Sequence, residues 1–144
     1  MKIIQGNLVK AAKQGRFDVI AHGCNCFCTM GSGIAKEIKA VFPRAYAVDC
    51  ETKKGDKSKL GGYTVAHYSK VDILNCYTQF TYGKGIHVDY EAIRSCMKRI
   101  NKQYAGKRVG LPKIGCGLAG GCWGVVLQII QEELKDCDVT IMWL

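Results

Sequence analysis

Residues 16–41, RFDVIAHGCNCFCTMGSGIAKEIKAV, contain a strand, a glycine-rich loop and a helix in immediate succession. Residues 17–22 form an apolar run with β-branched side chains, which predicts a buried strand. Residues 22–32 are small and polar and predict a loop, and Gly33–Val41 carries apolar residues at helical spacing. Glycines let the backbone approach a ligand, and the free N–H groups of a helix start attract anions. The stretch therefore predicts a phosphate site.

A second stretch near the C-terminus repeats this order. Residues 108–114 predict a strand, and residues 115–121, GCGLAGG, predict a second glycine-rich loop. A helix follows, and we expect its buried side to consist of Val125, Val126, Ile129, Ile130 and Leu134. The rest of the chain is organised to hold these two loops opposite each other.

The remaining pattern alternates strands with helices. Strands are predicted at residues 2–5, 63–69, 71–77 and 139–143, and helices at residues 8–14 and 44–54 and from an Asp89 cap to Tyr104. Such alternation favours an α/β fold, with a largely parallel sheet covered on both faces. Ligands of these folds bind beyond the carboxyl ends of the strands, where both glycine loops begin. The pattern alone predicts a two-loop cleft for a phosphorylated ligand.

Two common phosphate-binding motifs are excluded. Neither loop is followed by the Gly-Lys-Ser/Thr of a P-loop. Gly31-Ser32-Gly33 lacks the last glycine of the dinucleotide fingerprint.

Length and composition predict one globular domain spanning residues 1–144. Hydrophobic residues make up 48% of the chain, which is enough for a core. No apolar run reaches the ~18 residues of a membrane span, and the opening MKIIQG is unlike a signal peptide. We therefore expect a cytoplasmic protein without a membrane partner, and a monomer.

Nine cysteines are present, an odd number, and several fall inside predicted strands and helices. Without a secretory signal they are interpreted as free thiols in a reducing compartment. The spacing Cys24-x-Cys26-x-Cys28 does not match the usual zinc pairs, and no second pair exists. The sequence predicts no metal site.

The formal net charge is +9, and the basic residues are scattered. Lysines gather in residues 53–59, and basic side chains recur between Arg94 and Lys102. Scattered charge is more typical of a solvated surface than of a nucleic-acid face, although it leaves nucleic acid open as a partner. Positive charge of this size favours an anionic ligand.

Five motifs, taken in order, resemble those of a family. Gly6-Asn7-Leu8 resembles its Gly-Asp-Ile or Gly-Asp-Leu, and His22-Gly23-Cys24-Asn25 its His-Ser-Cys-Asn variant. Met30 to Ala35 is similar to a Gly-Gly-Gly-Val-Ala loop, and Leu111 to Leu118 is close to the second loop of the family. The ending at residues 139–144 also matches. Across essentially its whole length the sequence resembles a macro domain.

The resemblance implies a three-layer α/β/α fold with a central mixed, mostly parallel sheet. It also implies that ADP-ribose or a derivative is the small-molecule ligand, and that no cofactor is needed. The nearest branches by motif are the ADP-ribose-1″-phosphate phosphatases and the terminal ADP-ribose glycohydrolases. A glycohydrolase of this family needs a nucleophilic lysine, and it needs an acidic residue directly after Gly-Cys-Gly-Leu. In this chain the stretch that would carry the lysine is residues 77–80, which contain none, and the acidic position is Ala119. The strand-end His22 matches the phosphatase branch.

By this resemblance, site residues can be assigned one by one. Adenine contacts are implied for Asn7, which departs from the usual aspartate, and for Leu8 and Leu144. Asn25 is implied to bond the distal ribose. His22 is implied to be the catalytic general acid or base. The remaining ligand contacts are implied for Gly23, Cys24, Gly31, Ser32, Gly33, Ile34, Ala35, Ile114, Gly115, Cys116, Gly117, Leu118 and Ala119.

Three functions stay open from the sequence. The leading hypothesis is a phosphatase that hydrolyses ADP-ribose-1″-phosphate. The others are a non-catalytic ADP-ribose reader or sponge, and a hydrolase that removes ADP-ribose from protein or nucleic acid. Simpler interpretations also stand for single residues: His22, Cys24, Cys116 and Trp123 as packing residues, and residues 78–87 as an ordinary loop rather than a lid over the site.

Overall fold

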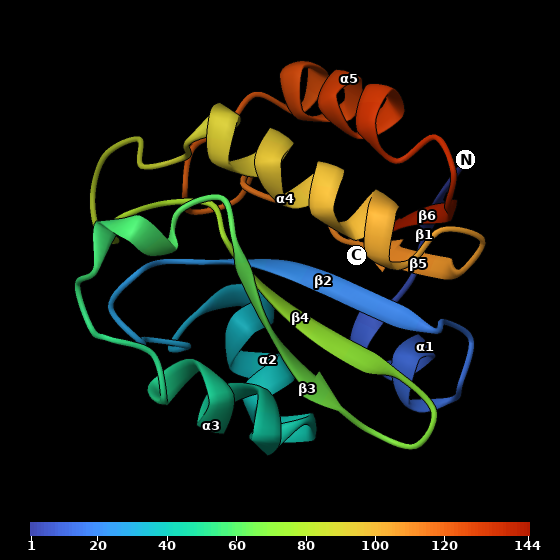
Figure 1. Ribbon diagram of the computed structural model, residues 1–144, viewed down its shortest axis with the longest axis horizontal. Helices are drawn as coiled ribbons and strands as arrows, with labels where there is room; N and C mark the ends of the chain where they lie inside the picture. Colours follow the sequence, from blue (N-terminus) through green and yellow to red (C-terminus); the bar gives the residue numbers. More distant parts are fainter.

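The computed structural model describes residues 1–144 and places a six-stranded sheet between two layers of helices (Figure 1). The strands are β1 (Lys2–Gln5), β2 (Val19–Cys24), β3 (Tyr63–His67), β4 (Asp72–Tyr77), β5 (Arg108–Leu111) and β6 (Asp138–Trp143). The helices are α1 (Leu8–Lys13), α2 (Gly33–Val41), α3 (Pro43–Cys50), α4 (Tyr90–Gln103) and α5 (Trp123–Glu133), with a short 3-10 helix η1 (Lys57–Lys59).

The strand order is β1-β6-β5-β2-β4-β3. Only β3 and β4 pair antiparallel, as a hairpin, and every other neighbouring pair is parallel. Because parallel strands point the same way, the carboxyl ends of β2, β4 and β5 lie at one edge of the sheet. The predicted three-layer fold with a mixed, mostly parallel sheet is confirmed.

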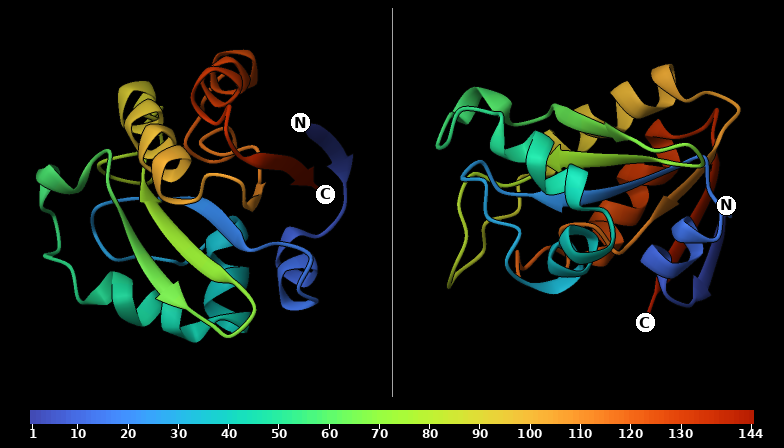
Figure 2. Two further views of the ribbon diagram at one scale, coloured as in Figure 1. Left: turned by 45° about the vertical axis from the view of Figure 1, so that its right-hand side comes forward. Right: turned by 90° about the horizontal axis from the view of Figure 1, so that it is seen from below.

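Each face of the sheet has its own core. Val19 and Ala21 of β2 pack with α4 and α5, whereas Ile20 packs with α1, α2 and α3. This division follows from the strand period of two, which sends successive side chains to opposite faces. Figure 2 shows the two helix layers on either side of the sheet. None of the helices combines the length and the apolar character that a membrane-spanning segment requires.

Helix starts differ in how they are capped. The Asn7 carboxamide oxygen accepts a hydrogen bond from the Lys10 N–H at 3.0 Å, and the Asp89 carboxylate accepts one from the Ala92 N–H at 2.9 Å. These contacts satisfy donors that the first turn of a helix leaves free. Ser32, at the start of α2, makes no such side-chain bond. The donors of that helix start stay available.

Several predicted boundaries are shifted; the strand predicted at residues 63–69, for example, is β3 and ends at His67. The strand predicted at residues 17–22 is β2 and continues to Cys24, because Cys24 still pairs with Tyr77 of β4. The strand predicted at residues 108–114 ends at Leu111, since the following proline has no N–H for the ladder. The helix predicted at residues 44–54 is α3, Pro43–Cys50, with the proline at its first position as expected.

The prediction that Val125 lies on the buried side of α5 is wrong. Val126, Ile129 and Ile130 are buried, but the Val125 side chain is 41% exposed. The three buried residues follow i, i+3, i+4 spacing, and Val125 is rotated about 100° away from that stripe.

Candidate functional site

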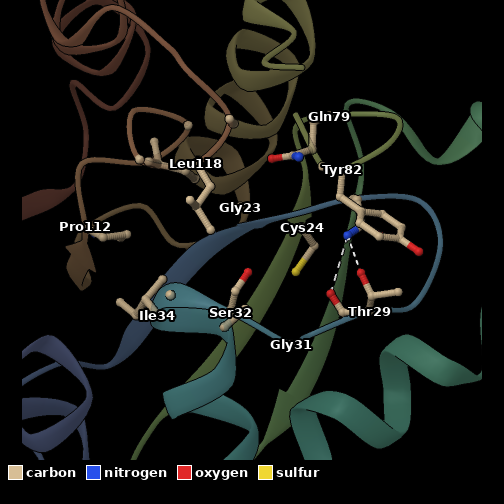
Figure 3. Close-up of a pocket in the computed structure, with 18 of the residues that line it drawn as sticks. Gly23, Cys24, Thr29, Gly31, Ser32, Ile34, Gln79, Tyr82, Pro112 and Leu118 are labelled. Atoms are coloured by element: carbon tan, nitrogen blue, oxygen red, sulfur yellow. Dashed lines mark hydrogen bonds between the residues drawn. The ribbon is translucent and has the colours of Figure 1, made fainter. Parts of the chain in front are cut away.

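A cavity of about 840 Å³ opens at the carboxyl ends of β2, β4 and β5 (Figure 3). Both glycine loops line it, as predicted, together with the loop that follows β4. Seven of its 21 lining residues are hydrophobic, and the others are glycines, polar residues, proline and lysines. The predicted site residues that line it are Gly23, Cys24, Asn25, Gly31, Ser32, Gly33, Ile34, Ala35, Ile114, Gly115, Gly117, Leu118 and Ala119.

Four predicted ligand contacts lie outside this lining. Leu8 is 3% exposed and packs in the core under α1 and α2. The Asn7 side chain caps α1 and donates a hydrogen bond to Glu37 at 3.0 Å. The Cys116 thiol turns back to the Ile114 carbonyl, and Leu144 is exposed beyond the end of β6.

Eight lining residues, in two groups, were not among the site residues assigned from the sequence, although the loop at residues 78–87, which supplies five of them, was considered as a lid over the site. One group belongs to the first loop and the loop after β4, and the other lies just after β5. The Gln79–Val88 bridge draws the ends of the loop after β4 together, which a scan for periodicity does not detect. The missed residues are Thr29, Gln79, Tyr82, Gly83, Lys84, Gly85, Pro112 and Lys113.

The N-terminus of α2 offers free donors to the cavity. The backbone N–H groups of Gly33, Ile34 and Ala35 take part in no hydrogen bond. The helix dipole adds partial positive charge, equivalent to about half an elementary charge, at this end. Unpaired N–H groups at a positively polarised helix end suit an anionic ligand, which is the ligand chemistry that the sequence predicts for this loop.

The second loop presents another row of donors. The backbone N–H groups of Gly117, Leu118 and Ala119 have no partner. The loop itself is closed by a hydrogen bond from the Gly121 N–H to the Gly115 carbonyl at 2.8 Å. A Cβ at position 121 would collide with that same carbonyl, so only glycine allows this closure.

His22 does not line the cavity, and the expectation that its ring reaches the cleft is wrong. The residue is 0% exposed, and its Nε2 donates to Asn75 Oδ1 at 2.7 Å. Burial lowers the pKa of His22 to about 4 from its ordinary 6.5, against the opposing effect of the Asn75 hydrogen bond. The ring is therefore neutral near pH 7 and lies beneath the site.

Asn75 extends this contact into a buried polar network between the sheet and α3. Its amide donates to the Ala45 carbonyl at 2.9 Å and to Thr64 Oγ1 at 3.0 Å. Next to it, the Tyr77 hydroxyl donates to Asp49 Oδ1 at 2.8 Å. Each polar side chain of this network thus has a hydrogen-bond partner, which is the condition for such a network to support the fold.

Cys24 separates His22 from the cavity. Its thiol lies 3.6 Å from His22 Nε2 and is 6% exposed. Burial raises the pKa of this thiol well above its ordinary value, so it stays protonated and is a poor nucleophile. The thiols of Cys26 and Cys28 contact other partners, the carbonyls of Gln79 and Asp49, so the three cysteines do not converge.

Asn25 organises the first loop. Its amide donates to Thr29 Oγ1 at 2.6 Å, and its carbonyl oxygen accepts from the Phe27 N–H at 2.8 Å. Figure 3 shows the Thr29 contacts at the rim of the cavity, below Tyr82. These hydrogen bonds brace residues 25–29, of which Asn25 and Thr29 line the cavity.

The floor of the cavity is Gly23. A Cβ at this position would lie 2.7 Å from Thr78 Oγ1, a buried hydroxyl that has no hydrogen-bond partner. Glycine is required here because Thr78 and Ile114 already fill the space under the strand end.

The charges that face the cavity have one sign. Lys84 and Lys113 line it, and no aspartate, glutamate or histidine does. The Lys113 ammonium lies 4.3 Å from the ring centroid of Trp143 and 5.6 Å from that of Trp123, two rings that are not part of the lining. Two lysines and two rows of free N–H groups favour a ligand with more than one negative charge.

Comparison with known proteins gives a family. The Macro domain model matches residues 21–130, which include both glycine loops. An uncharacterised 17.5 kDa protein of Enterobacteria phage T4 is 34% identical over 99% of this chain and 95% of its own length. A DNA ADP-ribosyl glycohydrolase of Thermus aquaticus is 25% identical over 99% of this chain, which spans 40% of that protein.

A third relative matches only in part. The ADP-ribose 1″-phosphate phosphatase of Debaryomyces hansenii is 37% identical over 45% of this chain and 39% of its own length. Among solved structures, a Bacteroides thetaiotaomicron protein of unknown function superposes with a TM-score of 0.81 at 28% identity, over 99% of this chain and 97% of its own. The macrodomain of Thermus aquaticus DarG superposes with a TM-score of 0.76 at 23% identity, over 99% of this chain and 97% of its own length. The predicted resemblance is confirmed: this chain belongs to the macro domain family.

Proposed function

We propose that this protein binds ADP-ribose in the cavity and hydrolyses ADP-ribose-1″-phosphate to ADP-ribose and phosphate. The observation that carries the proposal is the pair of unpartnered amide rows, at 33–35 and 117–119, on two sides of one cavity. A diphosphate lying between them would meet oriented donors on both sides, and donors fixed in advance lose little on binding.

The chemistry of the lining favours phosphoryl transfer over cleavage of a glycosidic bond. Glycoside hydrolysis ordinarily uses a pair of carboxylates, and no carboxylate lines this cavity. Phosphoryl transfer depends mainly on positioning and charge stabilisation, which N–H groups and lysines supply. Lys84, on the loop after β4, is the cation that we propose stabilises the transferred phosphoryl group.

The reaction is balanced without a covalent intermediate. The oxygen of a water molecule forms the new bond to phosphorus, and the bond between phosphorus and the 1″-oxygen breaks. That oxygen keeps the electron pair of the broken bond and takes up a proton to replace the one that the attacking water loses, so the products are ADP-ribose and inorganic phosphate. His22 does not touch the substrate in this scheme, since Cys24 lies between its ring and the cavity.

A non-catalytic reader is the second candidate. The absence of acid–base side chains from the lining favours it, because a binding module needs none. Hydrolysis of ADP-ribose from a nucleic acid is the third, favoured by the Thermus aquaticus relative that matches 99% of this chain.

Calorimetry with ADP-ribose tests the binding step, and we expect saturable heat. Release of inorganic phosphate from ADP-ribose-1″-phosphate tests the chemistry, with Lys84→Ala expected to reduce the rate by ~10²-fold, the scale of a lost electrostatic donor. Lys135→Ala, a change of an exposed lysine remote from the cavity, is the matched control.

Binding without phosphate release would exclude the phosphatase and leave the reader and the hydrolase that acts on nucleic acid. Absence of heat at millimolar ADP-ribose, with an unchanged melting temperature, would remove all three candidates.

A further inference from the structure

The two lysines of the cavity belong to opposite ends of it. Figure 3 shows Ile34 and Pro112 at one end and Tyr82 at the other. Lys113 follows Pro112 in the chain, and Lys84 stands two residues beyond Tyr82 on the loop after β4. The cavity therefore has a cation at each end in addition to its two rows of free amides.

The Lys113 ammonium lies on the β6 side of its end of the cavity. The rings of Trp143 and Trp123 flank it at 4.3 Å and 5.6 Å, measured to their centroids, and neither ring lines the cavity. Trp143 is the last residue of β6, and β6 lies next to β5 on the side away from β2. The charge is thus held on the flank of the cavity, just beyond the end that Pro112 forms.

No carboxylate of the protein neutralises this ammonium. Lys113 takes part in none of the ion pairs of the chain. The Glu37 carboxylate, one turn along α2 from Ile34, accepts a hydrogen bond from the Asn7 amide at 3.0 Å. The Lys113 side chain is half-buried, and aromatic rings attract a cation without cancelling its charge. An unpaired cation of this kind, beside a ligand cavity, favours an anionic group of the ligand.

The end formed by Ile34 and Pro112 suits the nucleoside of the proposed ligand. Both side chains are apolar and uncharged, which fits the flat faces of a base. The opposite end has the polar residues Thr29 and Gln79, together with Lys84. A base at the apolar end would bring its ribose, with the 2′- and 3′-hydroxyls, towards the side on which the Lys113 ammonium lies.

We infer that the substrate carries a phosphomonoester on the ribose of its nucleoside end, and that Lys113 binds this phosphate. The diphosphate of ADP-ribose is already served by the two amide rows, so ADP-ribose alone leaves Lys113 without an anion. A phosphomonoester brings nearly two negative charges at neutral pH, and a lysine binds it as a point charge. This inference rests on the proposed function for the ADP-ribose skeleton and adds the further phosphate.

The test is calorimetry with ADP-ribose and with its 2′-phospho and 3′-phospho derivatives, which distinguish the two positions. The quantity compared is the ratio of affinities, phosphorylated ligand over ADP-ribose, within each protein. We expect one of the two derivatives to bind the wild type at least ~10-fold more tightly than ADP-ribose, the scale of a charge-assisted hydrogen bond. Lys113→Met, which keeps an unbranched stem without the ammonium, should abolish this preference.

Lys84→Met is the matched control, because it removes a cation from the opposite end of the same cavity. Whatever it does to each affinity, their ratio should stay as in the wild type. Melting curves should show that both variants are folded. A preference that Lys113→Met retains would come from the net charge of +9 and would overturn the inference. A preference lost in Lys84→Met instead would place the phosphate at the other end and would also overturn it.

Adenosine 2′,5′-bisphosphate and adenosine 3′,5′-bisphosphate separate this inference from the proposed function. Heat from either that depends on Lys113, without heat from ADP-ribose, would support the phosphate site and overturn the proposed function. Wild-type protein that binds ADP-ribose and both of its phosphorylated derivatives with equal affinity would overturn the inference and leave the proposed function intact.

Discussion

Gly117→Glu is expected to weaken ADP-ribose binding at least ~100-fold while the protein stays folded. Position 117 lines the cavity, lies outside the left-handed backbone region, and has no atom within 4 Å of where a Cβ would be. A glutamate therefore fits without strain, but its side chain enters the ligand space. Its charge then stands within a few ångströms of the proposed diphosphate, where like charges cost up to about 4 kcal/mol at 4 Å.

Gly31→Glu tests the first loop in the same way. Position 31 is also open and unstrained, whereas Gly33 has φ +59° and would be strained by any side chain. Gly124→Glu is the matched control, because position 124 is exposed on the first turn of α5 and does not line the cavity. Calorimetry measures the affinities and melting curves check folding. Full affinity in a folded Gly117→Glu protein would mean that this cavity is not the binding site.

Acidification from pH 7 to 4 should reduce the free energy of unfolding by about 3 kcal/mol through His22 alone. The pKa of His22 is about 4 in the folded protein and near 6.5 when unfolded, because the buried ring has lost water. Between these values the unfolded chain binds the extra proton, so stability is complete above pH 6.5 and falls towards pH 4. The magnitude follows from the difference between these two pKa values, because each pH unit corresponds to about 1.36 kcal/mol.

Urea unfolding at several pH values measures this effect. His22→Gln keeps a hydrogen-bonding side chain without a titratable ring, so its stability should fall by about 3 kcal/mol less over the same range. His67→Gln is the control, since the His67 side chain is 72% exposed. Equal acid sensitivity in the wild type and His22→Gln would show that the ring is not held neutral by burial.

The burial of His22 also has a consequence for the proposed reaction. A buried neutral ring behind Cys24 predicts that activity does not follow a titration near pH 6.5. His22→Gln should then affect stability more than the rate of the proposed reaction. A rate that falls ~10²-fold in a folded His22→Gln protein, with unchanged ADP-ribose affinity, would return His22 to the acid–base role implied by the motif.

Local patterns were sufficient for most of the fold. The bounds of α2 were predicted without error, and Asp89 caps α4 as expected. Both signals are local: apolar spacing and a polar residue at a helix start depend on neighbours within a turn or two. The position of the two glycine loops at one edge also followed from the sequence, because parallel strands place their carboxyl ends together.

Side-chain positions at the cavity were predicted less well, and His22 shows why. The strand was expected to end at His22, but pairing of Cys24 with Tyr77 extends β2 by two residues. Two residues correspond to about 7 Å along a strand, so the ring lies that far below the edge. The partner strand is remote in sequence, and no local pattern reports where pairing stops.

The sequence by itself determined the layers, the order of elements and the placement of the two glycine-rich loops, because each depends on periodicity, glycine positions and strand direction. The tertiary structure decided which residues share a surface. Lys54, Lys57, Phe27, Phe80 and Tyr82 are scattered along the chain, and the sequence favoured a solvated surface for the lysines. Backbone hydrogen bonds between the first glycine-rich loop, the segment around η1 and the loop after β4 bring these residues to one side of the cavity. Such contacts depend on the packing of segments that are far apart in the chain, and no single stretch of sequence encodes them.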